Sequence, residues 1–313
     1  MKRFLVAIAG TLALAGSMLG ATAASAASHP IGSNPVAYGY PGASNTGYLV
    51  PLASLKQIPQ QITSGPGWSY SGGVVSINTA GTTLSGITTS AMIEVNAANV
   101  TIKTSRIYGA LTNSPGIALE RGANNTHIVN TLIAGTNGTS GGMLVGVKDV
   151  YGDPVTGTLI DKCNIYNASS GVQIYAGTVQ NSYIHDLSNT GSQHLEDFNS
   201  TGNDGFRLVI NHNTLFNKQS QTAAVYLGAD FSPSQNVAVT NNLLAGGGYT
   251  VYGGGVGVGQ WAAPKDITVT GNVFSSLYFA NGGYWGPVAY FDAGNGDVWS
   301  GNVWDGSGAV VNY

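Results

Sequence analysis

Apolar and polar residues alternate in short segments along the chain, and one such segment occurs four times near the C-terminus. The copies read RLVINHNTLFN, NVAVTNNLLAG, DITVTGNVFSS and DVWSGNVWDG. A period of two is typical of a strand with one buried face. The shared asparagines, Asn213, Asn242, Asn272 and Asn302, lie 29, 30 and 30 residues apart. Near-equal steps of this length indicate stacked repeats, and recurring amides in register predict a hydrogen-bonded ladder.

The repeat continues toward the N-terminus with insertions. The segments TTLSGI, NVTIKTSRI, NTHIVNTLI, GTLIDKCNI and TVQNSYI place small or polar residues in the asparagine column, namely Ser85, Ser105, Thr131, Cys163 and Ser182. A second strand series alternates with them: AMIEVN, GIALER, GVQIY, HLEDFN, AAVYLG, YTVYGG and VAYFDA.

Together the two series predict an all-β fold, a right-handed parallel β-helix over residues 67–313. It is a single-stranded solenoid of about eight to nine coils with a short N-terminal cap. The right hand follows from the general preference of parallel crossovers. A β-sandwich or a propeller is the alternative, but a sandwich would show hairpin turns and no asparagine column.

The first residues depart from this pattern. Lys2 and Arg3 precede an apolar run and then small residues up to Ala26, an order typical of a secretory signal peptide over 1–26. Glycines interrupt the run, which favours a signal peptide over a membrane anchor. We therefore expect a secreted protein, extracellular or at the cell surface, without membrane insertion.

Residues 27–66 are expected to form a lead-in and an N-terminal cap. The stretch up to Val50 is rich in Pro, Gly, Ser and Asn, which indicates irregular structure. Apolar residues from Pro51 to Ile62 have roughly helical spacing, so a short capping helix is predicted there. The first strand is predicted over Trp68–Ile77.

The composition and net charge of the chain limit the classes of partner that it can bind. Charged residues make up 8% of the chain, and loss of Lys2 and Arg3 would move its formal net charge from −3 to −5. Nucleic acid is therefore disfavoured as a partner. Cys163 is the single cysteine, so we expect a buried thiol and no internal disulfide. The oligomeric state is left open.

Outward positions of the second strand series carry acids, amides and tyrosines. This composition suits a long, polar ligand built of rings, such as a polysaccharide. The predicted substrate-binding residues are Glu120, Gln173, Tyr175, Asn199, Tyr226 and Tyr252 on the strands, with His185 and Asp186 at a neighbouring corner.

The phrases SYIHDL, TAAVYLGADFSPSQNVAVTNNLLAGGGYTVYGG and YWGPVAYFDAGNGDVWSGNVWD, with NVTIKTSRI, carry a family resemblance. From about Thr79 onward the chain resembles the secreted right-handed parallel β-helix proteins of actinobacteria and their phages, in the pectate-lyase-like superfamily. The central phrase of that family is Ile/Leu-His-Asp followed by His-x-Asp-Gly-x-Gln. Here Glu196 replaces its Asp, Asp197 its Gly and Asn199 its Gln. The resemblance implies a carbohydrate context at the level of the superfamily.

The densest group of chemistry-bearing side chains lies at 185–207. The predicted catalytic residues are His194, Glu196, Asp197, Asp204 and Arg207. Elimination from a uronic-acid chain would use a base, His194, and a cation on the substrate carboxylate. That cation would be Arg207, or calcium held by Asp197, Glu196 and Asp204. Hydrolysis would use two carboxylates, Glu196 or Asp197 with Asp204. Alternatively, Asp186 and Asp204 cap turns, His194 satisfies a loop carbonyl and Arg207 pairs with an acid.

The sequence thus predicts a secreted carbohydrate-active protein that binds an extended polysaccharide along the strand face, with polysaccharide lyase and glycoside hydrolase activity both open. A non-catalytic glycan-binding or adhesive surface protein is the alternative, and a structural spacer is the third hypothesis.

Overall fold

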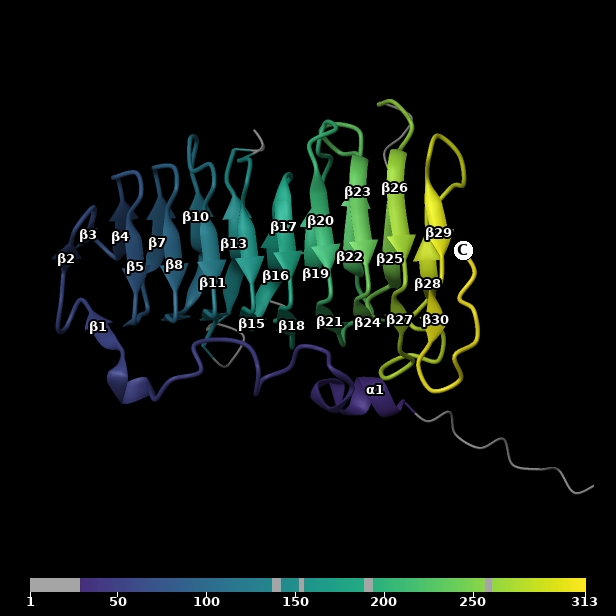
Figure 1. Ribbon diagram of the computed structural model, residues 1–313, viewed down its shortest axis with the longest axis horizontal. Coiled ribbons are helices and arrows are strands. Elements are labelled where there is room, and N and C mark those ends of the chain that lie inside the picture. Colours follow the sequence, from purple (N-terminus) through teal and green to yellow (C-terminus); the bar gives the residue numbers. More distant parts are fainter. Residues whose placement is uncertain (1–28, 137–141, 152–154, 189–193, 257–260) are drawn as a thin grey trace, which may run out of the picture.

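The computed structural model describes residues 29–136, 142–151, 155–188, 194–256 and 261–313 (Figure 1). The predicted signal peptide over 1–26 lies outside these ranges. The described strands stack into one elongated solenoid, and successive coils contribute strands to three sheets of ten, eleven and nine strands. The predicted all-β parallel β-helix is confirmed at this level, while its right hand stays a prediction.

We label the sheets A, B and C. Sheet A holds β1 Lys56–Ile58, β6 Ile87–Thr89, β9 Arg106–Tyr108, β12 Leu132–Ala134, β15 Asn164–Tyr166, β18 Tyr183–His185, β21 Thr214–Asn217, β24 Leu243–Gly246, β27 Val273–Phe274 and β30 Val303–Trp304. Sheet B holds β2 Ser64–Gly65, β3 Trp68–Ser71, β4 Val74–Ile77, β7 Met92–Val95, β10 Leu111–Leu119, β13 Met143–Asp149, β16 Ala168–Gln173, β19 Glu196–Ser200, β22 Ala223–Gly228, β25 Tyr249–Val256 and β28 Gly286–Ala289. Sheet C holds β5 Thr83–Ser85, β8 Thr101–Lys103, β11 His127–Val129, β14 Leu159–Asp161, β17 Gly177–Gln180, β20 Leu208–Asn211, β23 Gln235–Thr240, β26 Lys265–Thr270 and β29 Val298–Ser300.

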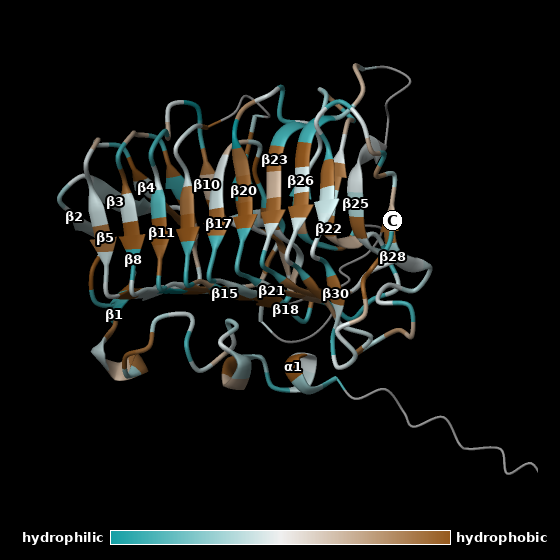
Figure 2. Ribbon diagram, turned by 45° about the vertical axis from the view of Figure 1, so that its right-hand side comes forward, coloured by the Kyte–Doolittle hydropathy of each residue, from teal (hydrophilic) through white to brown (hydrophobic). Residues whose placement is uncertain are grey.

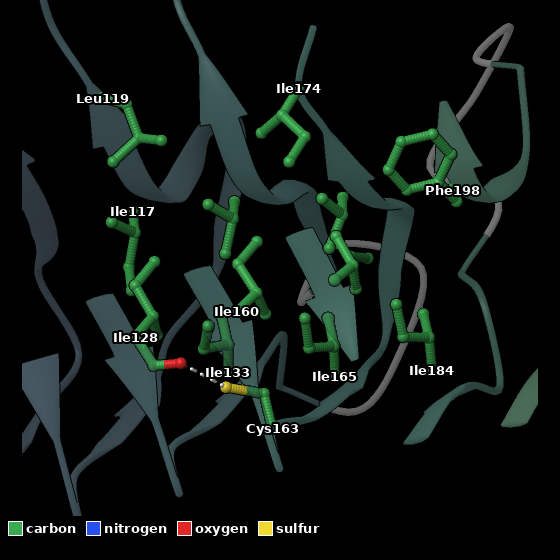
Figure 3. Close-up of a cluster of buried hydrophobic side chains, with 14 of the residues drawn as sticks. Ile117, Leu119, Ile128, Ile133, Ile160, Cys163, Ile165, Ile174, Ile184 and Phe198 are labelled. Atoms are coloured by element: carbon green, nitrogen blue, oxygen red, sulfur yellow. Dashed lines mark hydrogen bonds between the residues drawn. The ribbon is translucent and has the colours of Figure 1, made fainter. Parts of the chain in front are cut away.

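The core consists of apolar columns that run through successive coils, because parallel strands in register place equivalent residues above one another. Hydrophobic positions alternate along the strands (Figure 2), and the inward ones stack, as Ile128 does on Ile160 in sheet C and Ile133 on Ile165 in sheet A. Both sheets contribute to one cluster between them (Figure 3). Each such side chain contributes about 1.5–3 kcal/mol through burial.

The single cysteine belongs to this cluster. Cys163 is fully buried, and its Sγ lies 3.4 Å from the carbonyl oxygen of Ile128 (Figure 3). Burial raises the pKa of its thiol to about 12, so the thiolate is disfavoured. The prediction of a buried thiol is confirmed.

The asparagine ladder is confirmed at the corner before sheet A. The side-chain amide of each asparagine donates to Oδ1 of the next, at 3.0 Å for Asn213 to Asn242, Asn242 to Asn272 and Asn272 to Asn302. Each Oδ1 also accepts the backbone N–H of the preceding ladder asparagine. The residue before each one turns the chain with a positive φ, as His212 and Asn241 do at 53° and 56°.

Toward the N-terminus the column continues with small hydroxyl and thiol residues. Ser182 N–H donates to Asn213 Oδ1, and Cys163 N–H to Ser182 Oγ. The prediction that Ser85 belongs to this column is wrong. The strand register pairs Thr88 with Arg106, and therefore places Ile87 rather than Ser85 beside Ser105. Ile87 N–H accordingly faces Ser105 Oγ at 3.4 Å.

A strap of residues 29–55 runs along sheet A from the last coil back to the first (Figure 1). It contains α1 Pro30–Ser33 and two 3₁₀ turns, η1 Pro35–Tyr38 and η2 Leu52–Ser54. Thr214 Oγ1 donates to Pro41 O at 2.7 Å, and Gly47 N–H to Lys162 O at 2.9 Å. The expected irregular lead-in is thus bound along the solenoid. Among the described ranges, no helix has the length and apolar character needed to cross a bilayer.

The structure corrects two N-terminal predictions. The capping helix predicted over Pro51–Ile62 is wrong, since this stretch forms η2 and then β1, which pairs with the edge strand β6. Unpaired backbone groups on a sheet edge attract a strand more strongly than weak helical spacing favours a helix. The strand predicted over Trp68–Ile77 is split at Gly72 into the antiparallel pair β3 and β4.

Replacing Asp305 with alanine is expected to release the strap from the last coil. The buried Asp305 carboxylate accepts the N–H groups of Ile31 and Gly32, at 3.2 and 2.8 Å, and the hydroxyl of Ser275. Loss of these bonds should cost about 1–3 kcal/mol locally and expose residues 29–55 to proteases. Limited proteolysis with N-terminal sequencing measures this. Asn312→Ala on the exposed tail is the control, and equal cleavage of both variants would contradict the expectation.

Candidate functional site

The outer face of sheet B carries a groove near the middle of the solenoid. One outward row runs through Gln173, Asn199, Tyr226 and Tyr252, which are register partners on β16, β19, β22 and β25. The groove has a volume of about 610 Å³. Its lining residues are His194, Glu196, Asn199, Thr201, Gln221, Thr222, Tyr226, Asp230, Phe231 and Tyr252. We call it the sheet B groove.

Glu196 is the buried acid of the groove. It begins β19, is 2% exposed, and accepts a hydrogen bond from Ser170 Oγ at Oε2, at 2.7 Å. Burial raises the pKa of Glu196 above its usual range, although hydrogen bonds from Ser170 and Asn199 partly offset this. The carboxyl group therefore keeps its proton to higher pH than an exposed glutamate, which is the property that a general acid needs.

Asp230 is the exposed acid of the same groove. It follows β22, and the Tyr226 hydroxyl donates to Asp230 Oδ2 at 3.2 Å. Burial, and then the negative charge of Asp230, raise the pKa of Tyr226, which keeps this hydroxyl protonated as a donor. Asp230 is thus exposed to solvent, and the hydrogen bond from Tyr226 orients one of its carboxylate oxygens. One groove presents two carboxyl groups in opposite environments, an arrangement that separates an acid from a base.

Sequence reasoning missed Asp230. It lies in the segment after β22, whereas the sequence prediction considered only outward residues on the strands themselves. Its position could have indicated it, because Asp230 is only four residues from the predicted outward residue Tyr226. Phe231, 74% exposed, was missed for the same reason.

Aromatic rings extend the groove toward the C-terminal coils. The centroids of Tyr226 and Tyr252 are 5.4 Å apart, and those of Tyr252 and Tyr290 are 5.8 Å apart with nearly parallel planes. Tyr290 is exposed. Such a row offers flat apolar faces beside polar groups, which suits sugar rings.

Two polar side chains complete the floor and rim of the groove. His194 is exposed, with Nδ1 3.3 Å from Thr222 Oγ1. Asn199 is buried, and its Oδ1 has no hydrogen-bond partner among the described residues. An unpartnered buried acceptor in a binding groove indicates a place for a ligand donor.

Of the five predicted catalytic residues, His194 and Glu196 line the groove and three do not. Asp204 is exposed in the turn after β19 with a φ of 49°, and Arg207 donates from Nη1 to Asn236 Oδ1 at 3.0 Å. The expectation that Asp197 points outward is wrong, since its side chain is 0% exposed.

The strand geometry explains the burial of Asp197. Asp197 and Phe198 are consecutive buried residues where the chain enters sheet B from sheet A, so alternation fails there. The neighbouring coil has Gly171 beside Asp197, where a Cβ atom would lie 2.3 Å from the Ile184 methyl group. Asp197 therefore occupies a column of small residues that faces the interior.

The predicted corner residues His185 and Asp186 lie at sheet A and are not among the residues lining the groove. His185 stacks on Tyr183 with centroids 3.8 Å apart. His185 Nδ1 and Lys218 Nζ contact the Asp186 carboxylate at 2.7 and 2.6 Å. The hydrogen bond from His185, and then Lys218, lower the pKa of Asp186. These contacts engage the Asp186 carboxylate on the sheet A side, outside the residues that line the sheet B groove.

Among the predicted substrate-binding residues of the strands, Asn199, Tyr226 and Tyr252 line the groove. Gln173 lies in the same outward row, and its amide reaches the Tyr175 hydroxyl at 3.5 Å. Tyr175 is 6% exposed and so offers no stacking face. Glu120 bonds the Tyr151 hydroxyl farther toward the N-terminus.

The predicted calcium ligands do not converge. Glu196 faces the groove, Asp197 faces the core and Asp204 lies in a solvent-exposed turn. Within the described ranges, no three His, Cys, Asp or Glu residues gather in a way that could hold a metal ion.

Replacing Asp197 with alanine is expected to stabilise the protein by about 1–3 kcal/mol at neutral pH. Neither carboxylate oxygen has a hydrogen-bond partner among the described residues. Burial, and then the charges of Glu196 and Asp186, raise the pKa of Asp197 well above its usual value. The neighbouring residues in the column that contains Asp197 are small, so alanine fits at this position without a clash.

The sign of the pH effect follows from the raised pKa. The folded protein binds the Asp197 proton more tightly than the unfolded chain, so stability linked to it is greatest below the ordinary pKa of about 3.9. It falls by at most about 1.4 kcal/mol per pH unit until the folded-state pKa is passed. The stability gain of Asp197→Ala should therefore grow with pH, as urea unfolding at several pH values measures. Asp292→Ala on the surface is the control, and a pH-independent difference would contradict this account.

No protein-family model matches the chain, and a comparison with curated proteins also finds no match. Among solved structures the chain is similar to the Dettilon tailspike protein (gp208), with a TM-score of 0.29 and 14% sequence identity. The similarity covers 75% of this chain and 60% of that one, so the chain spans less than two thirds of the tailspike protein.

Proposed function

We propose that the protein is a secreted, carbohydrate-active β-helix protein that binds an extended glycan along sheet B and hydrolyses it in the sheet B groove. The observation that carries this proposal is the pair of carboxyl groups in one groove, Glu196 buried and Asp230 exposed. Glycoside hydrolysis uses one protonated and one ionised carboxyl group at the scissile bond.

Each residue then has a distinct role. Glu196 protonates the glycosidic oxygen, since burial raises its pKa. Asp230 acts as the ionised partner, with one oxygen held by Tyr226. Tyr252 and Phe231 supply ring faces for neighbouring sugars.

Hydrolysis is favoured over elimination by the charge of the groove. A lyase needs a cation on the substrate carboxylate, and no Arg or Lys is found among the described lining residues. Arg207, the predicted cation, is engaged with Asn236. Glu196 and Asp230 thus take the place of the predicted pair, which was Glu196 or Asp197 with Asp204.

The experiment is a panel of neutral, amino-sugar and uronic polysaccharides incubated with the purified protein. New reducing ends, without the absorbance of unsaturated uronic ends, support hydrolysis. Unsaturated ends would overturn it in favour of a lyase. Retention of a glycan with no product would overturn catalysis and assign the glycan-binding alternative.

A further inference from the structure

We propose that the sheet B groove selects glycans that carry free amino groups and discriminates against glycans that carry carboxylates. This inference rests on the proposed function, because it names the class of glycan that the groove would take. It concerns binding, so it can be tested without turnover.

The groove offers hydrogen-bond acceptors to a ligand. Asp230 is an exposed acid, whereas Glu196 is the proposed proton donor. Asn199 adds a buried Oδ1 without a partner among the described residues, and its side chain is more than nine-tenths buried. A ligand that matches this floor brings donors. A protonated amino group brings three donors and no acceptor.

No Lys or Arg among the described lining residues offsets the charge of Asp230, and His194 is the one histidine among them. Lys218 is paired with Asp186 at 2.6 Å, on the sheet A side. Lys148 lies in the same outward row as Asn199 but two coils toward the N-terminus, aligned with Gln173. A uronic acid bound in the groove would therefore bring its carboxylate toward Asp230, and like charges in close contact weaken binding.

The aromatic wall also favours a cation. Tyr226 and Tyr252 line the groove with tilted rings 5.4 Å apart, and Phe231 is largely exposed beside them. Ring faces attract ammonium groups in addition to stacking on sugars. Aromatic faces, acceptors and the charge of Asp230 therefore point to the same ligand class.

The test compares oligomers of equal length made of glucosamine, N-acetylglucosamine and galacturonic acid. Binding is measured by titration calorimetry on the full protein at low salt and mildly acidic pH. We expect the glucosamine oligomer to bind about tenfold more tightly than its acetylated counterpart, with a difference that shrinks at high salt. We expect the galacturonic acid oligomer to bind weakest.

Asp230→Asn keeps the size and the acceptor of Asp230 but removes its charge, and should reduce the preference for glucosamine to about threefold or less. Asp204→Asn removes an exposed charge outside the groove and should leave the preference unchanged. Equal binding of the acetylated oligomer, or tighter binding of galacturonic acid, would overturn this inference while leaving a glycan site in place. Failure of every glycan to bind would overturn the proposed function itself.

Discussion

Replacing Glu196 with glutamine is expected to lower turnover on the bound glycan by about 10²–10⁴-fold and to change its Kd by less than about threefold. Glutamine keeps the size of Glu196 and an oxygen that accepts from Ser170. It cannot donate a proton to the leaving oxygen. Release of reducing ends measures turnover, and calorimetry measures Kd.

The pH dependence of the proposed activity in the native protein gives a second readout for the same residue. A general acid must be protonated, so activity should fall as pH rises through the raised pKa of Glu196. Glu120→Gln, on the N-terminal coils and outside the groove, should retain native turnover. Native turnover in the Glu196→Gln protein would remove Glu196 from the mechanism, whatever the control shows.

Replacing Asn242 with alanine is expected to destabilise the protein by about 3 kcal/mol or more. The buried amide of Asn242 donates to Ile210 O and Asn272 Oδ1, at 2.9 and 3.0 Å. Its Oδ1 accepts the backbone N–H and side-chain amide of Asn213. Alanine removes the side-chain partner of the buried Asn213 backbone N–H and of Ile210 O, although its own backbone N–H still donates to Asn272 Oδ1, and it also opens a cavity.

Urea unfolding at constant pH measures this loss. Asn96→Ala is the matched control, since its exposed amide contacts Asn78 and Glu94 at the surface, and it should change stability by less than about 0.5 kcal/mol. A loss in Asn242→Ala no larger than the control would mean that water replaces the ladder. In that case the asparagine column would not stabilise the stack.

The architecture could be predicted because it repeats. Each coil satisfies the same constraints, so the spacing of Asn213, Asn242, Asn272 and Asn302 indicates both the stacking and the hydrogen-bonded column. The N-terminal cap could not be predicted in the same way. Lys56–Ile58 forms a strand because β6 presents an open edge, and that edge is invisible in the local pattern.

The candidate site was predicted in part for a related reason. Asn199 and Tyr226 follow from strand alternation on sheet B, and the structure places them in one groove with Glu196. Alternation fails for Glu196 and Asp197, because every residue of β19 is buried and Asp197, rather than Glu196, faces the core. Strand alternation could not place Asp230, because Asp230 reaches the groove from a loop rather than from a strand.

The contact between the strap and the last coil determines the order in which the parts of the molecule can assemble. Ile31 and its acceptor Asp305 are separated by 274 positions, so the segment synthesised early has no complete docking surface until the last coil exists. Coils can add one to another by local pairing, whereas closing this contact requires the whole stack. The strap therefore docks on the solenoid late in folding. A chain truncated before Asp305 would still stack its coils but would lose the contact that holds the strap to the last coil.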